Sequence, residues 1–147
     1  RADYTKWAEG YRISVKGNRV SWYKSKAKDY SYKTFRAYLD VVFAYAGTLS
    51  LAKELTSVPV TSMQIGDVLI QGGSPGHAVI VVDMAENPAT GEKLYLLAQS
   101  YMPAQDIQVL VNPKERDKSP WYTLKRMGNI LTPEWRFTSA DLKRFKN

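Results

Sequence analysis

Apolar and polar residues alternate twice near the start of the chain, over residues 11–15 and 19–23, and this alternation is typical of β-strands. Gly17-Asn18 lies between the two segments and suits the positive φ angles of a tight turn. The pattern therefore predicts an N-terminal β-hairpin. Its buried face would carry four apolar side chains, those of Ile13, Val15, Val20 and Trp22.

A helical pattern follows the hairpin. Ser31 can cap a helix that runs to about Ala46, because apolar residues recur there at spacings of three and four. We expect these residues to form one buried stripe: Phe35, Leu39, Val42, Phe43 and Ala46. Thr48 can cap a second, short helix over residues 49–55.

After Pro59 the pattern predicts β-structure. Four successive strands are expected, at residues 67–71, 76–84, 93–101 and 107–111, with a turn at residues 87–91. The apolar run at residues 79–82 does not alternate, so this strand should be buried on both faces.

Two further elements are expected near the C-terminus. Residues 134–137 have the pattern of an edge strand, and residues 138–141 have the character of a capping box, which predicts a terminal helix. Together the elements predict a single α+β domain over residues 1–147. In it, a helical layer packs on a central antiparallel β-sheet, with an N-terminal hairpin and a C-terminal helix.

Composition narrows the class of protein. A chain of 147 residues can bury a core without disulfide or metal cross-links, and no apolar run approaches the ~20 residues that span a bilayer. The chain begins at Arg1, without Met or a leader pattern, so we expect a mature form or a fragment. Oligomeric state and compartment are not indicated by composition.

The net charge of +7 is unevenly distributed. Both ends of the chain are basic and the middle is acidic, so a basic surface could bind nucleic acid, anionic glycan or membrane headgroups. Scattered lysines favour ordinary solvated surface charge instead. Nucleic-acid binding through Trp22, Tyr23 and the neighbouring lysines is the weaker expectation, because no known binding module is apparent.

The candidate chemistry centres on His77, the only histidine, in a chain that contains no cysteine. A hairpin turn centred on Pro88 would place Gln99 opposite His77, where its amide could fix the imidazole tautomer as the third member of a triad does. A slip of one residue would bring Ala98 or Ser100 there instead. The alternative is a structural histidine that bonds to a backbone carbonyl.

Other sites find little support in the sequence. Residues 72–76 match G-x-S-x-G, but a β-pattern follows Ser74 where a nucleophile elbow needs a helix, so we interpret the segment as a hairpin loop. One histidine without cysteine argues against a metal site. No phosphate-binding or dinucleotide-binding motif is present, and no cofactor is expected.

Several of these segments together resemble a known family. They are F-R-A-Y-L at 35–39, F-A-Y-A-G-T-L-S-L at 43–51, G-D-V at 66–68 with G-G-S-P-G-H-A-V at 72–79, L-A-Q-S-Y-M-P-A-Q at 97–105, N-P at 112–113 and S-P-W-Y at 119–122. The chain is similar in them to the bacterial family known as domain of unknown function 4846. The resemblance implies that this chain is the C-terminal portion of a longer protein.

A looser resemblance, in element order and in the Gly-Asp and Gly-His strand pair, is to NlpC-type papain-like peptidases. That group implies a Cys on a helix before the sheet, a His on the second strand and a polar residue on the third. His77 and Gln99 match the last two, whereas the Cys has no counterpart here. The resemblance implies a papain-like architecture in a bacterial, extracytoplasmic protein of the cell envelope.

These considerations give two functional expectations. The first is a hydrolase of peptide or peptidoglycan amide bonds, with His77 as general base, Gln99 as its orienter and the thiol outside these residues. We expect His77 to be partly exposed in a cleft lined by Gln71, Ser100 and Tyr101. The second is a non-catalytic module that binds peptide or cell-wall glycan in the same cleft.

Overall fold

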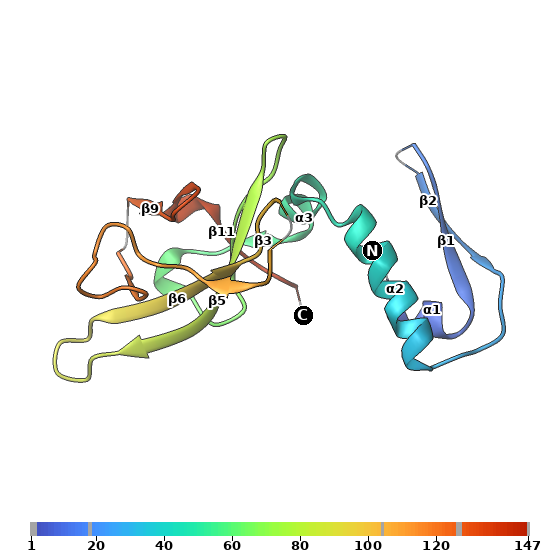
Figure 1. Cartoon of the computed structure of the whole chain (residues 1–147), viewed down its shortest axis with the longest axis horizontal. Helices are drawn as coiled ribbons and strands as arrows, with labels where there is room; N and C mark the ends of the chain where they lie inside the picture. The colour runs from blue at the N-terminus through green and yellow to red at the C-terminus, as the bar shows by residue number, and fades with distance from the viewer. Residues whose placement is uncertain (1–2, 18, 104, 126–127, 147) are drawn as a thin grey trace. The chain divides into compact units, whose positions relative to one another are not determined.

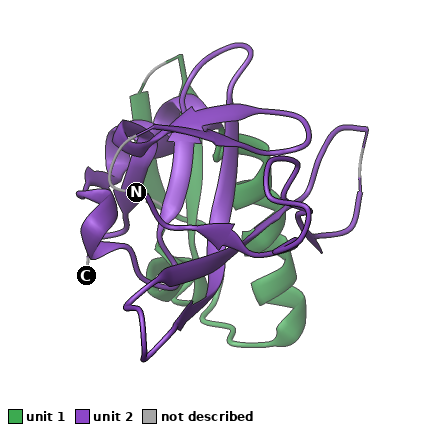
Figure 2. Ribbon diagram, turned by 90° about the vertical axis from the view of Figure 1, so that its left-hand side faces the viewer, with its two compact units in different colours: residues 1–47 green, residues 48–147 purple. Residues whose placement is uncertain are grey.

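The computed structural model describes residues 3–17, 19–103, 105–125 and 128–146, which fall into two compact units. Unit 1 comprises residues 1–47 and unit 2 residues 48–147, drawn in green and purple in Figure 2. Each unit has its own internal contacts and is described by itself. The single domain expected over residues 1–147 stays a prediction.

Unit 1 consists of two helices and a hairpin (Figure 1): α1 (Tyr4–Ala8), β1 (Tyr11–Lys16), β2 (Arg19–Lys24) and α2 (Tyr32–Tyr45). The hairpin is confirmed, with Ile13 paired to Trp22 and Val15 to Val20. Gly17 has the positive φ expected of the turn, while Asn18 lies outside the described residues. The prediction of a buried Val20 is wrong, because this two-stranded sheet leaves the side chain 60% exposed.

Helix α2 begins as predicted, with the Ser31 side chain accepting a hydrogen bond from the Thr34 amide. The predicted buried stripe is wrong: Phe35 and Phe43 are exposed, and the helix's buried residue is Thr34. The five-residue α1 is too short to cover the whole helix. Its aromatic rings contact those of Phe35 and Tyr38, which lie in the first half of α2.

Unit 2 is built mainly from short strands. Its helical elements are α3 (Thr48–Glu54) and the 3₁₀ turns η1 (Val60–Ser62) and η2 (Ser139–Asp141). Its strands are β3 (Thr56–Ser57), β4 (Val68–Gln71), β5 (His77–Glu86), β6 (Lys93–Gln99), β7 (Gln108–Val109), β8 (Tyr122–Thr123), β9 (Asn129–Leu131), β10 (Arg136–Thr138) and β11 (Leu142–Arg144). The four strands predicted after Pro59 are confirmed as β4 to β7.

Seven of these strands form one antiparallel sheet in the order β3-β11-β4-β5-β6-β7, with β8 also paired to β6. Strands β9 and β10 form a separate pair. Figure 1 shows β5 and β6 as the long central hairpin. The mixed fold and its antiparallel sheet are confirmed. The helical layer is small, because α3 is the only α-helix in the described part of unit 2, and the papain-like architecture is not confirmed.

The two faces of the sheet carry separate apolar clusters, so the prediction that β5 is covered on both sides holds. The main cluster includes Val79, Val81 and Leu97 with Phe137 and Leu142. The other face packs on α3 and includes Leu55, Val68, Ile70, Ala78 and Ile80. Within the apolar run only Val82 departs from this pattern, with 36% of its surface exposed.

The predicted terminal helix is wrong. The capping box between Thr138 and Asp141 forms, but the turn that it caps is the 3₁₀ element η2, and β11 follows. Leu142 is buried in the main cluster, and the Arg144 guanidinium binds the fully buried carboxylate of Asp67 at 2.6 and 2.9 Å. These contacts favour a strand over a helix. The predicted edge strand at 134–137 is found as β10, which begins two residues later and ends one residue later than expected.

No helix among the described residues is long and apolar enough to cross a membrane.

Candidate functional site

His77 is the first residue of β5 and pairs in register with Gln71, the last residue of β4. Residues 72–76 join these strands as a hairpin loop, which confirms that interpretation of G-x-S-x-G. A Cβ on the last glycine of the loop would collide with the Thr48 side chain, so glycine allows the loop to approach α3. Ser74 is exposed in this loop and leads into a strand, so it has no nucleophile elbow.

The register between β5 and β6 differs from the prediction. Gln99 was expected directly opposite His77, whereas the pairing places it level with Val79, two residues along β5. Because side chains alternate between faces with a period of two, an offset of two residues keeps both side chains on the same face. They continue the row of buried side chains that forms the main cluster.

A β-bulge on β5 determines this outcome. Val82 has no partner on β6, because two consecutive residues of β6 pair with the residues on either side of it. Between the bulge and the hairpin turn, the pairing is therefore shifted by one residue relative to the pairing on the His77 side of the bulge. If that register continued to His77, Gln99 would lie on the opposite face of the sheet.

The imidazole of His77 belongs to a chain of three polar side chains. Its Nε2 lies 2.6 Å from Oε1 of Gln99. Nε2 of Gln99 in turn donates to Oε2 of Glu134 at 2.7 Å. The hydrogen bond predicted between His77 and Gln99 is therefore present, and Glu134 extends it to the exposed edge of the unit.

The direction of this chain fixes the tautomer of His77. An ionised carboxylate can only accept, so the Gln99 amide must turn its NH₂ to Glu134 and its oxygen to the imidazole. Nε2 of neutral His77 then carries the proton, and Nδ1 holds the free lone pair. Every fully buried side-chain nitrogen of the described residues has a hydrogen-bond partner. No hydrogen bond to Nδ1 is found among those residues, so Nδ1 is not fully buried.

Three aromatic rings surround the imidazole. The ring centroids of Tyr101, Trp135 and Phe137 lie 5.2, 5.5 and 6.1 Å from that of His77. Such packing restricts rotation of the imidazole and excludes water from most of its surface. His77 is accordingly only 9% exposed, so the expectation of a partly exposed base is wrong.

Gln71 holds one of these rings in place. Its Oε1 accepts from Nε1 of Trp135 at 2.9 Å, and its NH₂ donates to Asp141 and to the Arg136 carbonyl. The whole Gln71 amide is thus used inside the protein, which orients Trp135 against His77. A direct contact of Gln71 with substrate stays a prediction.

The other two expected cleft residues differ in position. Tyr101 contacts His77 and is half-buried, so it is the expected residue that borders both imidazole and solvent. Ser100 is exposed just beyond the end of β6 and follows Gln99, whose side chain points to the imidazole. Their roles toward a substrate stay predictions.

Sequence reasoning missed Glu134 and Trp135. Both had been assigned to an edge strand, although each contributes a side chain to the site. Glu134 is 35 residues from its partner Gln99, and Trp135 is 64 residues from Gln71. A carboxylate beside a tryptophan was the only signal, and nothing local connects that pair to a histidine on another strand.

The described residues contain no group of three or more His, Asp or Glu side chains that could hold a metal ion. Unit 1 instead contains an open groove of about 740 Å³. Arg12 stacks on Trp7 in this groove, with its guanidinium carbon 4.1 Å from the ring centroid. Lys26 and Lys33 also line it, and among the described residues no carboxylate pairs with either ammonium group.

Comparison with known proteins adds one finding. The model of a family described as domain of unknown function (4846) matches residues 1–144. The chain belongs to this family. No curated protein and no solved structure matched the chain. The stronger of the two resemblances is thus confirmed over nearly the whole chain, whereas nothing in the comparisons supports the likeness to NlpC-type peptidases.

Proposed function

We propose that unit 2 of this member of the domain of unknown function (4846) family carries the base of a hydrolase site for amide bonds in peptide or peptidoglycan. The observation that supports it is the polar chain His77–Gln99–Glu134, because it occupies Nε2 and leaves Nδ1 as the acceptor nitrogen of the imidazole. A base fixed in one tautomer by a third group is the arrangement that activates a nucleophile in hydrolytic triads.

In this proposal Tyr101 borders the substrate, and Gln71 acts through Trp135 as a positioning residue. The nucleophile is a thiol, which the 147 residues do not contain. These residues alone should therefore be inactive. A peptidoglycan substrate also requires the site to lie outside the cytoplasm of a bacterium.

The first test is the tautomer. Nitrogen-15 NMR of the neutral imidazole should show a protonated Nε2 and an unprotonated Nδ1. Glu134→Gln should weaken this preference, since a neutral amide can either accept or donate. The opposite tautomer in the wild-type chain would remove the base from the proposal.

The second test is the reaction, measured on the protein at its natural length. A peptide carrying a thiol-reactive electrophile should label a cysteine, and His77→Ala should slow labelling by about 100-fold, as expected for loss of a general base. Gln99→Leu should have a smaller effect. Absence of labelling, or a rate that does not depend on His77, would contradict the hydrolase.

A second candidate function is non-catalytic binding of an anionic cell-wall peptide or glycan, favoured by the groove in unit 1. The groove combines flat surfaces, from stacked Arg12 and Trp7 and the half-exposed ring of Tyr23, with positive charge. The charge comes from Lys26 and Lys33, which pair with no carboxylate among the described residues. Carboxylates of a peptide or an acidic sugar would pair with the lysines while the rings contact its apolar parts.

Calorimetry can test this binding with muropeptides whose carboxylates are free or amidated. The free acids should bind more tightly, and a Lys26→Gln, Lys33→Gln double variant should lose that preference. Lys16→Gln, outside the groove, is the matched control and should retain it. A single-stranded oligonucleotide that binds more tightly than the muropeptides would indicate nucleic acid instead.

A further inference from the structure

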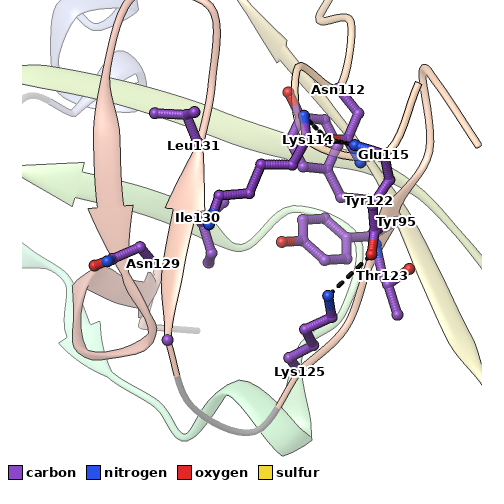
Figure 3. Close-up of a pocket in the computed structure, with 11 residues that line it drawn as sticks. Tyr95, Asn112, Lys114, Glu115, Tyr122, Thr123, Lys125, Asn129, Ile130 and Leu131 are labelled. Carbon is purple, nitrogen blue, oxygen red and sulfur yellow. Dashed lines mark hydrogen bonds and ion pairs between the residues drawn. The ribbon is translucent and has the colours of Figure 1, made fainter.

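A pocket of about 270 Å³ lies in unit 2, beside Tyr95 and Tyr122 of the main cluster (Figure 3). Tyr95 on β6, four residues before Gln99, lies at its base, and β8, β9 and the segment at residues 112–115 form its walls. Its volume is slightly below the roughly 300 Å³ at which ligand pockets usually begin. It therefore fits a small molecule.

The hydroxyl of Tyr95 is available for a ligand. Its side chain is only 2% exposed, and among the described residues no group bonds to its oxygen. Since no fully buried side-chain oxygen of those residues lacks a partner, this oxygen is accessible, and Tyr95 lines the pocket. The ring of Tyr122 stacks on Tyr95 at 5.6 Å, but its own hydroxyl is already used, because it donates to the Val111 carbonyl.

The protonation state of this hydroxyl follows from its surroundings. Burial, with the nearby Tyr122 and Glu115, raises the pKa of Tyr95 above its ordinary value. The phenol therefore stays protonated at neutral pH and presents a hydrogen-bond donor. A nearly buried donor without a partner among the described residues favours a ligand that supplies an acceptor.

Charged side chains at the mouth of the pocket determine which acceptor fits. The Glu115 carboxylate is held by Lys125 at 2.9 Å and by the Thr123 amide, so these charges cancel within the wall. Lys114 has no carboxylate partner among the described residues, and Figure 3 shows its side chain reaching across toward Ile130. The described residues that line the pocket therefore carry one positive charge that is not neutralised, that of Lys114.

We propose that this pocket binds a small organic carboxylate, with the Tyr95 hydroxyl and the Lys114 ammonium group holding the carboxylate. The ring of Tyr122 and the side chains of Ile130 and Leu131 contact the apolar body of the ligand. This site does not depend on His77 and does not require the proposed hydrolase.

The experiment is an NMR titration of the whole chain with benzoate, using benzamide as the neutral molecule of the same shape. Benzoate should give saturable shifts of backbone amides at residues 112–115, 122–125 and 128–131, and benzamide should bind at least about tenfold more weakly. Lys114→Gln should lower benzoate affinity about tenfold, as should Tyr95→Phe. Lys53→Gln, an exposed lysine on α3, is the control and should leave it unchanged.

Several outcomes would overturn the proposal. They are the absence of saturable shifts, equal affinity for benzamide and benzoate, and equal losses in the Lys114 and Lys53 variants. Lys114 is exposed, so its substitution keeps the test decisive even if Tyr95→Phe disturbs the core. His77→Ala should leave benzoate binding unchanged, which separates this site from the proposed function.

Discussion

Units 1 and 2 differ in where they place their charges. Residues 1–47 carry ten Lys or Arg against four Asp or Glu, whereas residues 48–147 carry eleven against ten, so nearly all of the net charge of +7 belongs to unit 1. Among its described residues, unit 1 buries only three side chains, those of Trp7, Ala8 and Thr34. Unit 2 contains both apolar clusters and the buried pair of His77 and Gln99.

The difference separates two ways of using polar groups. In unit 2, surrounding apolar side chains exclude water and hold each donor and acceptor in one geometry, which suits chemistry that depends on position. In unit 1, exposed cations such as Lys26 and Lys33 remain in water, where they attract anionic ligands over a distance. Four predictions test this contrast, in order of decreasing effect.

The largest effect is expected from removing a buried charge of unit 2. Asp67→Ala leaves the Arg144 guanidinium and the Gln64 amide without their acceptor, so we expect a loss of about 3–5 kcal/mol in the free energy of unfolding. Urea denaturation measures it. Glu9→Ala, which removes an exposed ion pair with Lys28 in unit 1, is the control. A comparable loss in both variants would abolish the contrast.

The next effect concerns two glutamines paired across neighbouring strands, Gln99 on β6 and Gln108 on β7. Gln99 is 3% exposed and Gln108 is exposed. Gln99→Leu leaves the buried Nε2 of His77 unpaired, so we expect a loss of about 1–3 kcal/mol in unfolding free energy and a mixture of imidazole tautomers. Gln108→Leu should change neither. Equal effects would show that burial does not decide the outcome.

A smaller effect is expected in unit 1. Trp7→Phe removes the hydrogen bond from Nε1 to the Thr34 carbonyl and part of the ring beneath Arg12. We expect protection of α1 and α2 amides from hydrogen exchange to fall by about 1 kcal/mol. Tyr30→Phe, which removes an exposed hydrogen bond to Glu9, should leave protection unchanged. If protection is already negligible in the wild type, unit 1 is less ordered than its contacts imply.

The smallest effect is a dependence on pH. Lys125 and Thr123 lower the pKa of Glu115 to about 2, from an ordinary value of 4.5. The folded form thus holds the proton less tightly, so Glu115 contributes stability above about pH 4.5 and loses it as pH falls toward 2. Carbon-13 titration of the carboxyl group should show this, and Lys125→Gln should raise the pKa. An unchanged pKa in that variant would mean that Lys125 is not the cause.

The sequence predicted local elements better than their surroundings. Alternation and capping residues located the N-terminal hairpin, α2 and β4 to β7, because these signals depend on neighbours along the chain. The apolar spacing of α2 could not show that α1 is too short to cover Phe43. Likewise, the capping box at Thr138 could not show that Leu142 and Arg144 find better partners in a strand.

The candidate site shows the same limit. The hydrogen bond between His77 and Gln99 was expected from a turn centred on Pro88, but the predicted register was wrong because the pairing of Glu86 with Lys93 centres the turn between Ala89 and Thr90. No sequence signal marked the bulge that returns Gln99 to the face of His77. Glu134 and Trp135 come from a segment that reaches His77 only through tertiary structure. Pairing across a hairpin can be counted along the chain, whereas contacts between separate segments cannot.

The unpaired Val82 has a consequence for how this hairpin can change during evolution or in the laboratory. A strand has two sides only, so what matters at this position is whether Val82 bulges out or is paired, rather than which side chain it carries. Deleting Val82 would remove the bulge but keep Val81 opposite Leu97, so Gln99 would stay on the face of His77. A ladder that instead paired Val82 regularly would turn Ala98 and Ser100 toward His77 and move Gln99 away. Beyond Val82, the exposed turn around Asn87 can be lengthened or carry an inserted tag, because the pairing near His77 is set on the near side of the bulge.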